Sequence, residues 1–134
     1  MRDLLEAFKK LRGYEELRGK LRSGGRSIWV HSLYGSARSF LIASLIEELD
    51  SPLLVITPSQ DDAEKTVSDL IEFGAEALLF PEWSSHIHID LPPPKGVVAD
   101  RISALKALIK GERCAVICPV ASACLLYTSP SPRD

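Results

Sequence analysis

The stretch "PLLVITP", residues 52–58, decides the fold, because it is an unbroken apolar run between two prolines. Such a run indicates a strand that is buried on both faces of a parallel sheet. The next stretch, "SQDDAEKTVSDLIEFG", residues 59–74, has Ser59 as a helix N-cap, acidic residues in its first turn and Gly74 as its stop. A strand that leads directly into a capped helix is the unit from which α/β proteins are built.

The same alternation of strand and helix continues on both sides of this unit. The patterns predict further strands at 27–33, 77–83 and 114–120, and helices at about 36–49 and 97–111. Between them, "SSHIHIDLPPPKG" contains three consecutive prolines, which exclude a helix or a central strand. The sequence therefore predicts an α/β fold with a parallel sheet and right-handed crossovers.

Composition excludes several classes of protein. The 134 residues are 46% hydrophobic and 25% charged, with a net charge of −2, which excludes a globally basic nucleic-acid binder. No apolar run reaches the ~20 residues that span a bilayer, and no signal peptide opens the chain, so we expect a cytoplasmic protein without membrane contact.

The first 26 residues have a charge pattern of their own, with eight Lys or Arg against four acids. We interpret 1–26 as an amino-terminal helix and linker whose apolar residues pack inward; these are Leu4, Phe8, Leu11 and Leu21. Contact of the basic helix 1–22 with nucleic acid or a membrane surface is the alternative.

The last eleven residues, "CLLYTSPSPRD" (124–134), break with everything before them. They are identical to the translation of a transposase-type sequencing adapter, so we interpret them as adapter read-through on a truncated gene, non-native and disordered. A native Pro-rich tail is the alternative. The predicted α/β domain thus covers 27–123.

Two cysteines remain, Cys114 and Cys118 in "CAVICPV". Four residues apart on a strand they are roughly 13 Å from each other, which is too far for a disulfide or a shared metal ion. We expect them to be small buried hydrophobic residues.

The candidate site is the turn that opens the helix at 36. A phosphate loop has the spacing G-x-x-x-x-G-K-[ST] between a strand and a helix. Here the register reads "SLYGSARS", with Ser32, Ala37 and Arg38 in place of Gly, Gly and Lys, and only Ser39 fits. The methyl of Ala37 blocks close approach of a phosphate, and the fork of Arg38 differs in shape from a lysine ammonium. The residues assigned to this degenerate phosphate loop are Ser32, Gly35, Ser36, Ala37, Arg38 and Ser39.

The partner acid that holds the metal in an ATPase is also missing. Of the later predicted strands only the one at 77–82 ends in an acid, Glu82. We therefore expect no ATP hydrolysis and no catalytic residue. Two interpretations of the loop stay open: weak anion binding, or a strand-to-helix turn with no ligand. His86 and His88 alternate beside Asp90, but a zinc site needs three or four ligands, so we expect an ordinary surface loop and no metal site.

The ordered set of motifs resembles the start of the bacterial transcription-repair coupling factor (Mfd) family, whose amino-terminal module is similar to the first domain of the repair protein UvrB. The matching stretches occur in order across 27–123: "LYGSARSFLIASLIEEL", "PLLVITPSQDDAEKTVSDLIEFG", "LLFPEW", "VVADRISALKALIKG" and "VICPVASA". UvrB carries an intact phosphate loop here and the coupling factors a degenerate one, so "SLYGSARS" resembles the coupling factors. After "FPEW" the chain departs from the family pattern.

The resemblance implies a three-layer fold like that of P-loop NTPases and of UvrB domain 1. It also implies that this fragment is not an enzyme and holds no cofactor. It implies a parent protein that removes RNA polymerase stalled at DNA lesions, recruits UvrA for nucleotide excision repair, and contacts double-stranded DNA. ATP and Mg²⁺ would serve a separate motor domain of that parent, and the partners of this module would be other domains of the same chain. The alternatives are an active ATP-binding UvrB or helicase-type fragment, and a stand-alone doubly wound domain.

Overall fold

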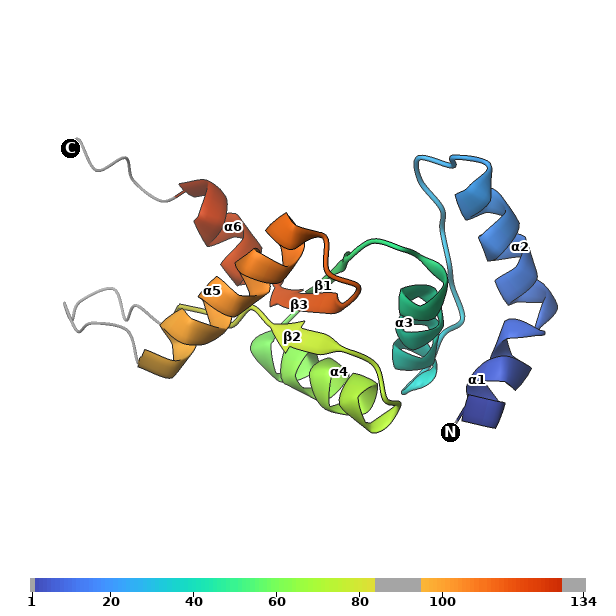
Figure 1. The fold of residues 1–134 in the computed structure, drawn as a ribbon, viewed down its shortest axis with the longest axis horizontal. Coiled ribbons are helices and arrows are strands. Elements are labelled where there is room, and N and C mark those ends of the chain that lie inside the picture. The colour runs from blue at the N-terminus through green and yellow to red at the C-terminus, as the bar shows by residue number, and fades with distance from the viewer. Residues whose placement is uncertain (1, 84–94, 129–134) are drawn as a thin grey trace.

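The computed structural model describes the backbone of residues 2–83 and 95–128 (Figure 1). The elements, in chain order, are α1 (Arg2–Lys9), α2 (Arg12–Arg22), α3 (Ala37–Glu48), β1 (Leu53–Thr57), α4 (Gln60–Glu72), β2 (Ala77–Leu79), α5 (Lys95–Lys110), β3 (Ala115–Pro119) and α6 (Val120–Thr128). Within these residues no helix is both long and apolar enough to cross a membrane.

The three strands form one parallel sheet in the order β1-β3-β2. The central strand, β3, is buried along its whole length, because strands flank it and helices cover it. The predicted α/β fold with a parallel sheet is confirmed. The strand within 52–58 is present as β1, but it lies at an edge of the sheet and its Leu54 and Ile56 are more than half exposed, so the prediction that it is buried on both faces is wrong.

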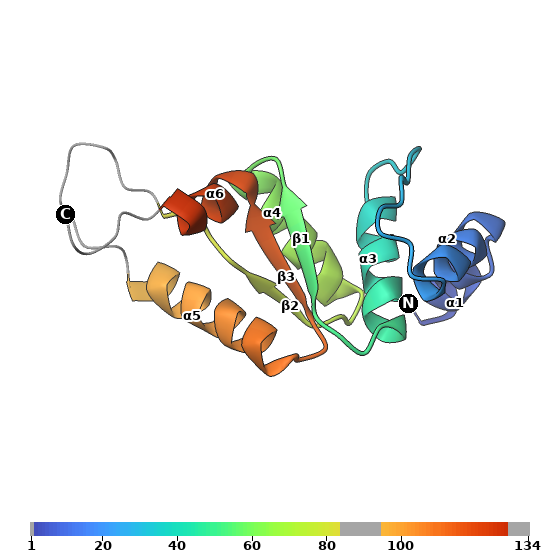
Figure 2. The same ribbon diagram turned by 90° about the horizontal axis from the view of Figure 1, so that it is seen from above.

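Helices lie on both faces of the sheet (Figure 2). Residues that alternate along β3 enter two separate cores, as the two-residue period of a strand requires. Ala115 and Ile117 pack with Leu70 of α4 in the first core. Val116 and Cys118 pack with Ala104 and Ala107 of α5 in the second, where the small alanines let the helix approach the sheet closely.

Cys114 and Cys118 are buried with free thiols, as the sequence predicts. Burial raises the pKa of both thiols, which favours the protonated, unreactive form. These cysteines therefore fill the second core as small hydrophobic residues.

The helix after β1 begins and ends as predicted. The Ser59 hydroxyl accepts the backbone N–H of Asp62 at 3.2 Å, which satisfies one of the first-turn donors. Gly74 follows the helix with a φ of +78°, a conformation that glycine adopts without strain.

The predicted strand at 27–33 is wrong. Residues 25–34 form no regular structure, and the side chain of Trp29 is 91% exposed. A β-rich segment becomes a strand only when it pairs with another strand, and 27–33 pairs with none of the three strands of the sheet. The strand predicted over 77–83 is also shorter, because Pro81 follows it closely and has no N–H to donate.

The amino-terminal segment is two helices rather than one, with a break at Lys10 and Leu11. The break changes which residues face inward. Leu5 and Tyr14 are each 4% exposed, whereas Leu4 and Leu11, which the pattern placed inside, are more than half exposed. The prediction for Leu4 and Leu11 is therefore wrong, because it assumed one continuous helical face.

Ion pairs fasten these two helices to the end of α3. Lys9 pairs with Glu47, and Arg18 and Arg22 both pair with Glu48. The buried Tyr14 hydroxyl donates to the same Glu48, with 3.0 Å between the two oxygens. The basic charge of the amino-terminal helices is thus partly neutralised by α3.

Tyr14→Phe tests this contact through the pH dependence of stability. Burial, and then the hydrogen bond to Glu48, raise the pKa of Tyr14 above its ordinary value. A raised folded-state pKa stabilises the fold below the unfolded pKa of about 10, and this stability is lost as the pH rises further. Above pH ~10 we expect the wild type to lose about 1.4 kcal/mol per pH unit more than Tyr14→Phe, measured by urea unfolding. Tyr34→Phe, on a side chain that is 83% exposed, should behave like the wild type.

The carboxy-terminal segment also differs from its prediction. Helix α6 runs to Thr128, so 124–128 is helical and the expected disorder of these residues is wrong. A helix continues where the chain carries good helix formers such as Ala123 and Leu125, whatever their origin. Residues 129–134 lie outside the described part.

Candidate functional site

The degenerate phosphate loop lies at the amino-terminal end of α3, beside the carboxyl end of β1. It borders a small cavity of about 160 Å³ between α3, β1 and α4. The residues that line this cavity are Gly35, Arg38, Ser39, Ile42, Val55, Ile56, Thr57, Pro58, Asp62, Lys65, Thr66 and Asp69. Open α/β sheets bind their ligands at the carboxyl ends of strands, so this is the expected place for a site.

The backbone of the loop turns sharply without a preceding strand. Ser32 and Gly35 have φ angles of +64° and +55°. The N–H of Ala37 donates to the carbonyl of Tyr34 at 3.2 Å, and the Ser36 side chain makes no capping hydrogen bond. Of the predicted order of strand, loop and helix, the structure therefore contains the loop and the helix but not the strand.

Ser39 is tied to a residue that sequence reasoning missed. Its side chain is only 4% exposed, and its hydroxyl donates to Oδ2 of Asp69 on α4, with 3.0 Å between the oxygens. In a phosphate loop the hydroxyl at this position binds Mg²⁺. No motif could have identified Asp69, because it lies 30 residues further along the chain.

The charges that line the cavity are balanced. Arg38 and Lys65 contribute two cations, and Asp62 and Asp69 contribute two carboxylates. Asp62 is further engaged by Ser59, whose hydroxyl donates to its Oδ2 at 2.8 Å. The cavity therefore has no excess of positive charge toward an anion.

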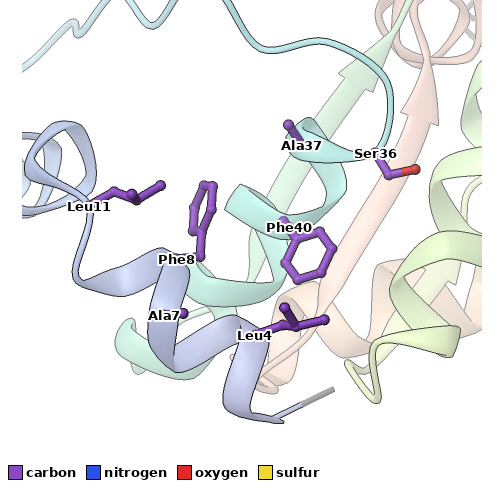
Figure 3. A pocket seen from close by; sticks show the side chains of 7 residues that line it. All are labelled: Leu4, Ala7, Phe8, Leu11, Ser36, Ala37 and Phe40. Carbon is purple, nitrogen blue, oxygen red and sulfur yellow. The ribbon is translucent and has the colours of Figure 1, made fainter.

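Two of the three remaining loop residues face a different hollow, and Ser32 lines neither. Ser36 and Ala37 line an apolar pocket of about 440 Å³ between α1 and the start of α3. Leu4 and Phe8 of α1, and Leu11 at the start of α2, gather around it with Phe40 of α3 (Figure 3). The six predicted loop residues are therefore not brought together around one cavity.

Glu82 does not take part in the site. Its backbone N–H donates to Oε1 of Gln60 at 3.0 Å, and it is absent from the cavity lining. Nearby, Arg101 donates to the carbonyl of Pro81 at 2.8 Å and lies 4.0 Å from the ring centroid of Phe80. This arginine fixes the "FPEW" segment, a role that no sequence signal indicated.

In the part of the chain that the structure describes, no three His, Cys, Asp or Glu side chains lie close enough together to hold a metal ion. His86, His88 and Asp90 lie outside those residues.

Comparison with known proteins adds one relative. The chain is similar to the transcription-repair-coupling factor of Bacillus subtilis. The two are 29% identical over 126 residues, which cover 90% of this chain and 10% of that protein. No family model matches the chain, and no solved structure matches it. The similarity supports a region related to the coupling factor, and the chain spans about a tenth of that relative's length.

Proposed function

We propose that this chain is a non-catalytic, UvrB-like module from the amino-terminal part of a transcription-repair coupling factor. The similarity to the Bacillus protein, which extends over 90% of the chain, supports this proposal. The parallel sheet with helices on both faces is compatible with a P-loop NTPase-like fold.

The hydrogen bond from Ser39 to Asp69 is the observation that carries the non-catalytic part of the proposal. It engages the hydroxyl that would coordinate Mg²⁺. The carboxylates of Asp62 and Asp69 line the same cavity and would oppose the negative charge of a nucleotide phosphate. The cavity of about 160 Å³ is also below the roughly 300–1,000 Å³ of typical small-molecule pockets.

The module then acts as a scaffold for the other domains of its parent chain. In that parent, ATP and Mg²⁺ serve a separate motor domain, and the partners are RNA polymerase, UvrA and double-stranded DNA. The compartment is the cytoplasm, where transcription and excision repair take place in bacteria. Sequencing the parent gene beyond codon 123 tests this, since regions for UvrA binding and for DNA translocation should follow.

Titration with fluorescently labelled ATP and Mg²⁺ tests the loss of nucleotide binding. We expect no saturable binding in the micromolar range for the wild-type chain. The back-substituted variant Ala37→Gly/Arg38→Lys should also fail to bind, because Asp69 still occupies the Ser39 hydroxyl. The same pair combined with Asp69→Ala removes this obstacle and should bind more tightly than the pair alone.

Each result has a defined consequence. The scaffold proposal is wrong if the wild type binds ATP saturably, with micromolar affinity and dependence on Mg²⁺, and if Arg38→Ala abolishes this binding. The chain would then be an ATP-binding domain. Circular dichroism of every variant verifies that a missing signal does not come from unfolding.

A further inference from the structure

The two amino-terminal helices are attached to the domain in different ways. Both lie beside α3, on its side away from the sheet (Figure 1). Leu5 of α1 belongs to the first core, but among the described residues neither core includes a residue of α2. A cavity of about 160 Å³, lined by Leu21 of α2 and by Leu45 and Leu49, lies between α2 and the end of α3. The apolar packing of α2 on α3 is therefore incomplete.

The sequence of α2 does not favour a helix on its own. The helix has 11 residues, and isolated helices shorter than ~12–15 residues are marginal in water. It contains Gly13 and Gly19, and glycine is among the weakest helix formers. A Cβ added at either glycine would meet no atom within 4 Å, so no close contact requires a glycine there. Leu11 at the N-cap makes no side-chain capping hydrogen bond. Contacts with α3 must therefore hold α2 in its helical form.

These contacts converge on one carboxylate, that of Glu48. It pairs with Arg18 and with Arg22, whose Nη2 lies 3.2 Å from Oε1, and its Oε2 accepts the Tyr14 hydroxyl at 3.0 Å. All three partners belong to α2. The Glu48 side chain is 15% exposed, whereas the two arginines are 46% and 68% exposed, so dissolved ions reach both pairs from the arginine side.

Glu48 is placed unfavourably for α3 itself. It is the last residue of that helix, where the helix dipole disfavours a negative charge. The cations of α2 compensate this charge. Removing the charge therefore weakens the attachment of α2 without weakening α3.

We propose that α2 is a conditional helix, which is helical only while Glu48 holds it on α3, and that it opens as one unit while the sheet stays folded. High ionic strength favours the open form, because salt screens the attraction between Glu48 and the two arginines. Opening uncovers the ring of Tyr14, which is 4% exposed in the closed form, and the apolar cavity beside Leu45. The chain thus contains a conformational switch that responds to ionic strength.

Amide hydrogen exchange of the 134-residue chain, resolved by residue with NMR, measures the opening. We expect the amides of 16–22 to exchange through one common opening that is more frequent than that of β3. Raising NaCl from about 0.05 to about 0.5 M should increase this opening several-fold. Glu48→Gln should increase it at least about tenfold at low salt, because both arginines and Tyr14 lose a charged partner. This variant should also lose most of the response to salt.

Two further variants serve as controls. Glu47→Gln makes the same change one residue earlier, where the carboxylate pairs with Lys9 of α1, and it should leave the opening of 16–22 unchanged. Gly19→Ala should act in the opposite direction and slow the exchange of 16–22 about fourfold, because alanine is the better helix former and the position has room for its methyl. Circular dichroism verifies that each variant folds.

Leu70→Ala decides whether α2 opens alone, because Leu70 stabilises the sheet and does not contact α2. This variant should speed exchange in β3 and leave that of 16–22 unchanged. An equal increase in both segments overturns the proposal, since α2 would then unfold only together with the sheet. So does an effect of Glu48→Gln on 16–22 that is no larger than that of Glu47→Gln, because α2 would then not depend on Glu48.

Discussion

Leu70→Ala is expected to lower the free energy of unfolding by about 2–5 kcal/mol. Leu70 is 0% exposed and packs from α4 against Ala115 and Ile117 of the central strand. Its removal leaves a cavity in the first core, which the neighbouring small residues cannot fill. Urea unfolding followed by circular dichroism measures the loss.

The next residue in the chain supplies the control. Ile71 is 60% exposed on the outer face of the same helix, so Ile71→Ala should change the stability by no more than about 0.5 kcal/mol. Equal losses for the two variants would contradict the orientation of α4 on the sheet.

Asp69→Ala is expected to destabilise the fold by about 1–3 kcal/mol, because it leaves the buried Ser39 hydroxyl without its acceptor. Ser39→Ala/Asp69→Ala removes both polar partners and should recover part of that loss. A double-mutant cycle by urea unfolding measures the coupling between the two residues.

Additive losses in this cycle would show that Ser39 and Asp69 do not interact, which would also remove the main support for the non-catalytic proposal. Glu72→Ala, on an exposed acid one turn further along α4, is the control and should be close to neutral.

The parts of the fold that the sequence predicted well have local causes. The strand within 52–58 follows from an apolar run, and the following helix from its Ser59 cap and its Gly74 stop. Each of these signals acts within a few residues. The stretch 27–33 has an equally good strand pattern, but it pairs with no strand of the sheet.

The sequence by itself determined the alternation of strands and helices and the replacement of the phosphate-loop residues at Ser32, Ala37 and Arg38. Only the tertiary structure decided that Ser39 donates to Asp69, that five of the six loop residues divide between two hollows, and that β1 lies at the edge of the sheet. The physical reason is that propensity, capping and backbone conformation depend on neighbours along the chain. Hydrogen-bond partners, strand order and burial depend on segments that only folding brings together.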